Sequence, residues 1–238
     1  AFSRARMNAT FISADGDGVR CRYNVGVRNR GKGSRRPPPN NYRVDFPNDR
    51  PWQGVTAINI NSKYTYLQFL GHRLFAAAAL PALNAHRVQV RINGRNPALD
   101  DPERMHGSYV QLEIYGSDWA EEHLPYDPDG NLYRCASNEW RCDLEYLGED
   151  PNAYAWEGYE KATNASESDW SDLIQLTWVL NESPDDMYVR LVEESVDVDQ
   201  WLRWLALQTL LVNRETNLSN GRGDDYYMYR GIWDRRFV

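Results

Sequence analysis

Apolar and polar residues alternate along two short segments in the N-terminal half of the chain, residues 21–29 and 108–114. Alternation with a period of two is typical of a β-strand that has one buried face. Residues 42–46, 55–61 and 87–94 have the composition of further short strands. We expect 21–29 and 42–46 to form a hairpin with a long basic loop, and 87–94 to pair with 108–114. The sequence therefore predicts an antiparallel sheet.

Helices are predicted between and after these strands. The expected helices are residues 66–80, ended by Pro81, then 170–181, and one that begins at Asp197 or Asp199 and runs to about Val212. Strands are expected at 226–230 and from 235 onward, whereas 116–159, rich in Asp, Tyr, Trp and Gly, is expected to be irregular. The predicted fold class is α+β: one domain over residues 1–238, with an antiparallel sheet, several helices and a long irregular insertion.

The charges of the chain are distributed unevenly. The net charge is −7, which disfavours a general nucleic-acid binder, yet residues 20–50 carry nine basic residues against two acids, and acids dominate residues 143–199. A basic edge on an acidic body can bring an anion to a metal-binding centre, and an uneven polar surface is the alternative. No run of about 18 apolar residues is present, so no membrane span is expected.

The cysteines allow one short disulfide. Cys135 and Cys142 flank a six-residue loop and could be joined, which would leave Cys21 free. A zinc site is not expected, because there is no CxxC pair and the four His are scattered. The chain begins without an initiator Met, which is consistent with a processed protein or a fragment.

Three groups of residues have the composition of a chemical site. A loop with two glycines and several cations, residues 28–35, can surround phosphates, or it can be an ordinary basic loop. Glu113, near the end of a predicted strand, can orient a lysine or hold a metal, or it can face solvent. Residues 213–216 and 223–229 place a carboxylate and two adjacent Asp around a helix end and a strand start. This arrangement suits phosphoryl transfer with Mg²⁺, and the alternative is an ordinary turn between a helix and a strand.

The order of these segments resembles the CotH kinase family, the spore-coat-protein-H-like atypical kinases. Residues 27–35 resemble its Arg-Gly-x-Ser-Ser-Arg loop, and 41–46 its Lys-Ser-Tyr-x-x-x-Phe strand. The other resembling segments are 88–94 with 107–113 (Val-Asn-Gly and Gly-x-Tyr-x-x-x-Glu), 130–134 (Gly-Asn-Leu-Tyr-Lys), 196–213 (the helix before Asn-x-Asp) and 225–229 (Asn-Tyr-Tyr-Leu-Tyr). Each motif is short, but their shared order extends over most of the chain.

The resemblance implies a divergent protein-kinase-like fold that transfers phosphate from ATP to Ser or Thr of an acceptor protein, with Mg²⁺ or Mn²⁺. It implies an extracytoplasmic protein that is secreted, on the cell surface or in the spore coat. On this interpretation Glu215 is the catalytic carboxylate beside Asn213, and Asp225 is a metal ligand. The nucleotide-binding residues would be Arg30, Lys32, Ser34, Arg35, Glu113, Arg134 and Lys161.

The sequence departs from the family pattern at several positions. Asn40 and Asn41 stand where the strand lysine is expected, and Lys32 or Lys161 could substitute for that lysine. Arg134 replaces a second lysine, and Glu215 replaces the catalytic Asp. The family's final Asp-x-Asp would follow Val238, so we expect the domain to be incomplete at its C-terminus. The alternative is a non-catalytic surface or structural module that binds through aromatic residues such as Trp119, Trp140, Tyr154 and Trp156. A nucleic-acid binder is a weaker third hypothesis.

Overall fold

The computed structural model describes residues 3–31, 35, 38–97, 108–135, 142–213 and 223–238, and its fold is α+β, as predicted. The chain divides into two compact units. Unit 1 comprises Ala1–Ala77 and Ala82–Ile114, and unit 2 comprises Ala78–Pro81 and Tyr115–Val238. The single domain expected from the sequence stays a prediction, and each unit is described by itself.

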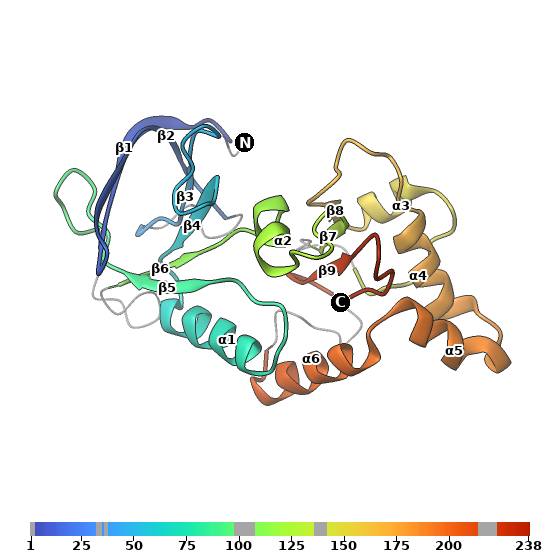
Figure 1. Ribbon diagram of the computed structural model, residues 1–238. Coiled ribbons are helices and arrows are strands. Elements are labelled where there is room, and N and C mark those ends of the chain that lie inside the picture. The colour runs from blue at the N-terminus through green and yellow to red at the C-terminus, as the bar shows by residue number, and fades with distance from the viewer. Residues whose placement is uncertain (1–2, 32–34, 36–37, 98–107, 136–141, 214–222) are drawn as a thin grey trace. The chain divides into compact units, whose positions relative to one another are not determined.

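Unit 1 contains a curled antiparallel sheet (Figure 1). Its strands are β1 (Met7–Asp15), β2 (Gly18–Asn29), β3 (Tyr42–Asp45), β4 (Ala57–Asn61), β5 (Ala85–Val88) and β6 (Tyr109–Leu112), in the order β1-β2-β3-β4-β6-β5. The predicted pairings of β2 with β3 and of β5 with β6 are confirmed. Strand β1 was not expected; it pairs with β2 around a two-residue turn at Gly16 and Asp17, and its Asp-Gly-Asp-Gly sequence was the signal for that turn.

The two faces of the unit 1 sheet differ in character. Val44 and Ile58 are opposite each other on β3 and β4 and belong to a buried apolar cluster with Val25. Because successive side chains of a strand point to opposite faces, Arg43 and Asp45 lie on the other face. Helix α1 (Thr65–Ala77) packs against β5 and β6, where its Phe69 contacts a second small cluster (Figure 1).

Unit 2 is a small antiparallel sheet with helices. Its strands are β7 (Asn131–Cys135), β8 (Tyr159–Lys161) and β9 (Tyr227–Arg230), in the order β8-β7-β9. Its helices are α2 (Ser117–His123), α3 (Pro151–Trp156), α4 (Ser171–Glu182), α5 (Asp185–Ser195) and α6 (Val198–Leu210). The predicted N-cap of α6 is confirmed, because the Asp197 carboxylate accepts a hydrogen bond of 3.0 Å from the N–H of Gln200.

The prediction that residues 116–159 are irregular is wrong. This region contains α2, β7, α3 and the start of β8, each too short, at three to seven residues, to produce a clear hydrophobic period. Two of its aromatic residues that were considered for the surface, Trp119 and Tyr154, are buried, whereas Trp156 is exposed and Trp140 lies outside the described residues.

Three smaller differences concern element boundaries. Helix α5 was not expected, although two acidic residues in succession, Asp185 and Asp186, are typical of the first turn of a helix. The strand expected over residues 87–94 ends at Val88. The strand expected from residue 235 is reduced to isolated bridges of Phe237 with Val196 and Arg230.

Cys135 and Cys142 form a disulfide, as the sequence allowed, with their Cα atoms 6.0 Å apart. Both residues are buried in the core of unit 2, and Cys21 is free. Within the part of the chain that the structure describes, no helix is long and apolar enough to cross a membrane.

Candidate functional site

The two units have net charges of opposite sign. Unit 1 has 17 Lys and Arg against 8 Asp and Glu, a net charge of +9, and unit 2 has 10 against 26, a net charge of −16. The whole-chain value therefore says little about either unit. Binding of an anion is electrostatically favoured on unit 1.

The predicted phosphate loop follows β2. The backbone N–H of Arg30 donates to the carbonyl of Asn41 at 2.9 Å, and its guanidinium donates to Oδ1 of Asn61 at 2.5 Å. The guanidinium of Arg35 donates to the carbonyl of Ser3 at 3.2 Å. The other two residues predicted for this loop, Lys32 and Ser34, lie outside the described residues.

Sequence reasoning missed an arginine cluster next to this loop. Arg28 on β2 is directly opposite Arg43 on β3. The carboxylate of Asp45 accepts from Nε of Arg6 at 2.6 Å and from Nε of Arg43 at 2.7 Å. We name Arg6, Arg28, Arg43 and Asp45 the arginine cluster. The sequence predicted the hairpin but not its register, which places residue 28 opposite residue 43.

Arg28 is the unsatisfied member of the arginine cluster. Its guanidinium makes no hydrogen bond or ion pair with any residue that the structure describes, although the side chain is partly buried. Burial lowers the pKa of Arg28, the Arg43, Arg35 and Arg6 cations lower it further, and Asp45 opposes them. A single carboxylate thus faces several guanidinium groups. The cluster retains a net positive charge that an anion could neutralise.

Asn41 is one of the two residues that stand where the family resemblance expects the strand lysine. Asn41 is buried, and its Oδ1 accepts from the backbone N–H of Ser62 at 2.7 Å and from the Ser62 hydroxyl at 2.9 Å. The amide therefore connects the start of β3 with the end of β4. This neutral side chain has a structural role here and contributes no charge to an anion site.

Glu113 is buried at the end of β6, so the alternative of a solvent-facing glutamate is wrong. Its carboxylate accepts from the backbone N–H of Asn84 at 2.6 Å and from the Asn84 amide at 2.8 Å. Burial lowers the pKa of His72 on α1, and the Glu113 charge opposes that shift. Glu113 is thus a fixed carboxylate in unit 1, a suitable group to orient a cation.

In unit 2 the structure brings Arg134 and Asp225 together. The guanidinium of Arg134 on β7 lies 3.9 Å from the carboxylate of Asp225 and 3.9 Å from that of Glu160 on β8. Nε of Arg134 is buried and has no hydrogen-bond partner among the described residues. Asp225 is exposed and adjoins Asp224, whose carboxylate accepts from the Asp225 N–H at 2.9 Å.

These carboxylates fit a magnesium site in part. Mg²⁺ is commonly held by one or two protein carboxylates together with substrate phosphates and water, and Asp224 and Asp225 offer such oxygens. The Arg134 cation beside Asp225 opposes a metal ion there by Coulomb repulsion.

The remaining predicted residues do not join this pair. Lys161 is opposite Tyr133 in the sheet, so it lies on the other face from Arg134, and its Nζ donates to the carbonyl of Asp169 at 2.9 Å. The Asn213 amide donates to Oε1 of Gln208 at 2.7 Å, just beyond α6. Glu215, the predicted catalytic carboxylate, lies outside the described residues.

Comparison with known proteins agrees with the motif order. Residues 27–237 match the family described as CotH kinase protein. A similar protein is the inner spore coat protein H of Bacillus subtilis (strain 168), 25% identical over 191 residues, which are 78% of this chain and 49% of that protein. The chain therefore spans about half the length of this relative. Because the family match covers most of the sequence, the chain belongs to the CotH kinase family.

Proposed function

We propose that the chain is an ATP-dependent phosphotransferase with a divergent protein-kinase-like fold, acting on Ser or Thr of an acceptor protein. Family membership supports this proposal. The observation that carries it is Arg28, a partly buried guanidinium that has no partner among the described residues and lies opposite Arg43. A desolvated cation is costly unless an anion pairs with it, and phosphate is well matched to guanidinium groups.

In the proposed reaction the acceptor hydroxyl oxygen attacks the γ-phosphorus, and the bond from that phosphorus to the β–γ bridging oxygen breaks, releasing ADP. Glu215 takes the proton of the hydroxyl, with Asn213 close to it in sequence. Arg28 and Arg30 bind phosphate oxygens. Asp225 would hold Mg²⁺, which neutralises charge on the phosphates.

A second candidate function is a non-catalytic binding module that retains the fold. Two observations favour it: the buried Asn41 amide in the strand-lysine motif, and the Arg134 cation 3.9 Å from the proposed metal ligand Asp225. Such a module would keep the family's shape and lack efficient transfer.

Thermal unfolding with and without ATP distinguishes the two functions. The phosphotransferase predicts a rise in unfolding temperature with ATP and Mg²⁺ or Mn²⁺, reduced in Arg28→Gln and made metal-independent in Asp225→Ala. Incorporation of radiolabelled phosphate into a protein acceptor would then establish transfer. The absence of any ATP-dependent shift with either metal would favour the binding module.

We also propose that the chain functions outside the cytoplasm, at a cell surface or in a spore coat. The Cys135–Cys142 disulfide supports an oxidising location, and the name of the Bacillus subtilis relative supports a coat. Alkylation of thiols in freshly isolated native protein tests the location. Labelling at Cys21 alone is expected, and labelling of all three cysteines would contradict it.

A further inference from the structure

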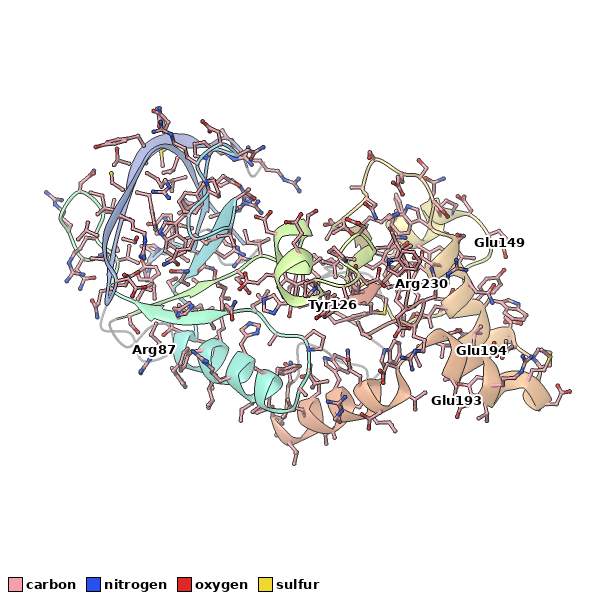
Figure 2. All side chains as sticks on the ribbon, viewed as in Figure 1. Arg87, Tyr126, Glu149, Glu193, Glu194 and Arg230 are labelled. Atoms are coloured by element: carbon pink, nitrogen blue, oxygen red, sulfur yellow. A yellow bond between two sulfur atoms is a disulfide. The ribbon has the colours of Figure 1, made fainter. Side chains whose placement is uncertain are left out.

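A cleft of about 520 Å³ opens on unit 2, within the size range of small-ligand sites. Its walls come from the loop before α3, the segment before α4 and α4 itself. The lining residues that matter most are Glu149, Ser168, Asp169, Trp170, Gln175 and Trp178. Figure 2 labels Glu149 on the side of unit 2 that carries α3 and α4.

The helical period of α4 builds one wall of the cleft. Trp170, Ile174 and Trp178 follow one another at intervals of four residues, so their side chains form a stripe along the helix. Gln175 lies beside this stripe, one residue after Ile174. Both tryptophans are half-buried, and the cleft therefore presents two indole groups next to an amide.

Several polar groups of the cleft are available to a ligand. The indole N–H groups of Trp170 and Trp178, the Gln175 amide and the Ser168 hydroxyl make no hydrogen bond to the residues described by the structure. The set includes donors only (indole N–H) and groups that both donate and accept (amide and hydroxyl). A ligand that satisfies them must itself donate and accept.

The two carboxylates of the cleft are already stabilised. One oxygen of Glu149 accepts from the Tyr146 hydroxyl at 2.7 Å, and one oxygen of Asp169 accepts from the backbone N–H of Ser171 at 2.9 Å. The bonds from Ser171 lower the pKa of Asp169, with a contribution from the Lys161 and Arg230 cations. A carboxylate oxygen can accept more than one hydrogen bond, so both groups can still accept from a ligand. The charge of Asp169 is already partly balanced by the Lys161 and Arg230 cations.

We propose that this cleft binds a saccharide chain. A sugar ring offers an apolar C–H face to an indole ring and hydroxyl groups that donate and accept around its edge. A cationic side chain would leave the indole and amide donors unused, and an anion would be repelled by Glu149 and Asp169. The mixed set of donors, acceptors and aromatic faces matches a neutral polyhydroxylated ligand best.

The proposal does not depend on phosphoryl transfer. Arg134 and Asp225 belong to the proposed nucleotide site, and neither lines the cleft. A chain that has no kinase activity could still bind a saccharide, which is compatible with the binding-module alternative. An active kinase could use the cleft to locate a glycan-bearing surface.

The test is calorimetric titration with neutral trisaccharides of glucose and of N-acetylglucosamine, and with an arginine-rich peptide. At least one trisaccharide is expected to bind, with an affinity that salt does not change, because a neutral ligand has no ion pairs to screen. Binding only of the peptide, weakened by salt, would overturn the proposal, as would no binding of either trisaccharide at millimolar concentration.

Variants locate the binding in the cleft. Trp178→Ala is expected to reduce the affinity for the trisaccharide by about tenfold. Gln175→Ala removes an exposed side chain and no core contact, and it is expected to reduce the affinity by a few-fold. The control is Trp156→Ala, which removes a tryptophan that is 71% exposed on α3 and does not line the cleft. Unchanged affinity in Gln175→Ala and Trp178→Ala, or an equal loss in Trp156→Ala, would contradict the assignment.

Discussion

Arg28 on β2 lies directly opposite Arg43 on β3, so two guanidinium groups share one cross-strand position of the unit 1 sheet. Like charges at such positions destabilise a sheet. The Asp45 carboxylate bonds to the Arg43 and Arg6 side chains, and the Arg28 guanidinium has no hydrogen bond or ion pair in the described chain. The position is therefore unfavourable for stability and favourable for binding an anion.

Arg28→Gln should change stability and binding in opposite directions. Without ligand, the variant is expected to be more stable by up to about 1 kcal/mol, because a cross-strand repulsion is removed. With pyrophosphate or ATP it should gain less stability than the parent protein. Urea unfolding with and without these anions measures both effects. Arg91→Gln, an equal charge change at an exposed residue of unit 1, is the control, and equal behaviour of both variants would contradict the anion site.

His72 should make the stability of the protein depend on pH. Burial lowers the pKa of His72 below 6.5, and its Nδ1 accepts from the Leu83 N–H at 3.4 Å, which requires the neutral ring. As the pH falls, the His72 ring therefore takes up a proton at a higher pH in the unfolded chain than in the folded chain. Stability from His72 is complete above pH 6.5 and is lost as the pH falls through the lower folded pKa.

The His72 prediction is checked by urea unfolding from about pH 7.5 to about pH 5, where histidine titrates. His72→Gln is expected to reduce the slope of the unfolding free energy against pH. His86→Gln, the same substitution at an exposed position of β5, controls for the general effect of replacing a histidine. If His72→Gln kept the full slope, another group would have to be responsible.

The fold was predictable wherever local patterns were long enough. Strand β2, helix α1 and the Asp197 cap of α6 follow from alternation, helical period and a capping side chain. Helix α2 and strand β7 were missed because they are short and stabilised by tertiary contacts, such as the burial of Trp119 and Tyr133.

The candidate site was predictable only as a set of residue types. The motifs identified Arg134 and Asp225 separately, and the structure places them 3.9 Å apart. The pairing of Arg28 with Arg43 depends on the β2–β3 register, which a sequence motif does not specify. Lys161, one residue after Glu160, falls on the opposite face from Arg134 for the same reason.

Asp172 should be important for the stability of unit 2. Its buried carboxylate accepts from the Tyr133 hydroxyl at 2.5 Å, from the Asn131 amide at 2.8 Å and from the Leu173 N–H at 2.8 Å. Asp172→Ala leaves these donors without an acceptor, and we expect a loss of about 2–4 kcal/mol in unfolding free energy.

The companion variants separate this network from general effects of substitution. Tyr133→Phe removes one donor and should cost about 1 kcal/mol, and the double variant should lose less than the sum. Glu193→Ala, at an exposed residue of α5 (Figure 2), should change the unfolding free energy by less than about 0.5 kcal/mol. Additive losses in the double variant would show that the Tyr133–Asp172 bond contributes nothing.

Arg134 should control the affinity of Asp225 for a divalent cation. At 3.9 Å the guanidinium is close enough to oppose a metal ion by about 1 kcal/mol in a solvent-exposed setting. Arg134→Gln is therefore expected to bind Mn²⁺ about fivefold more tightly in the absence of nucleotide, measured by proton relaxation. Asp225→Asn should abolish the gain.

Arg134→Gln is expected to change the affinity for ATP in the opposite direction to the affinity for Mn²⁺. If Arg134 also contacts a phosphate, as the family resemblance implies for its position, the variant should bind ATP more weakly while it binds Mn²⁺ more tightly. The non-catalytic module predicts tighter Mn²⁺ binding with no measurable ATP affinity in either protein. Unchanged Mn²⁺ affinity in Arg134→Gln would mean that the metal, if it binds, does not use Asp225, and the assignment of that ligand would be withdrawn.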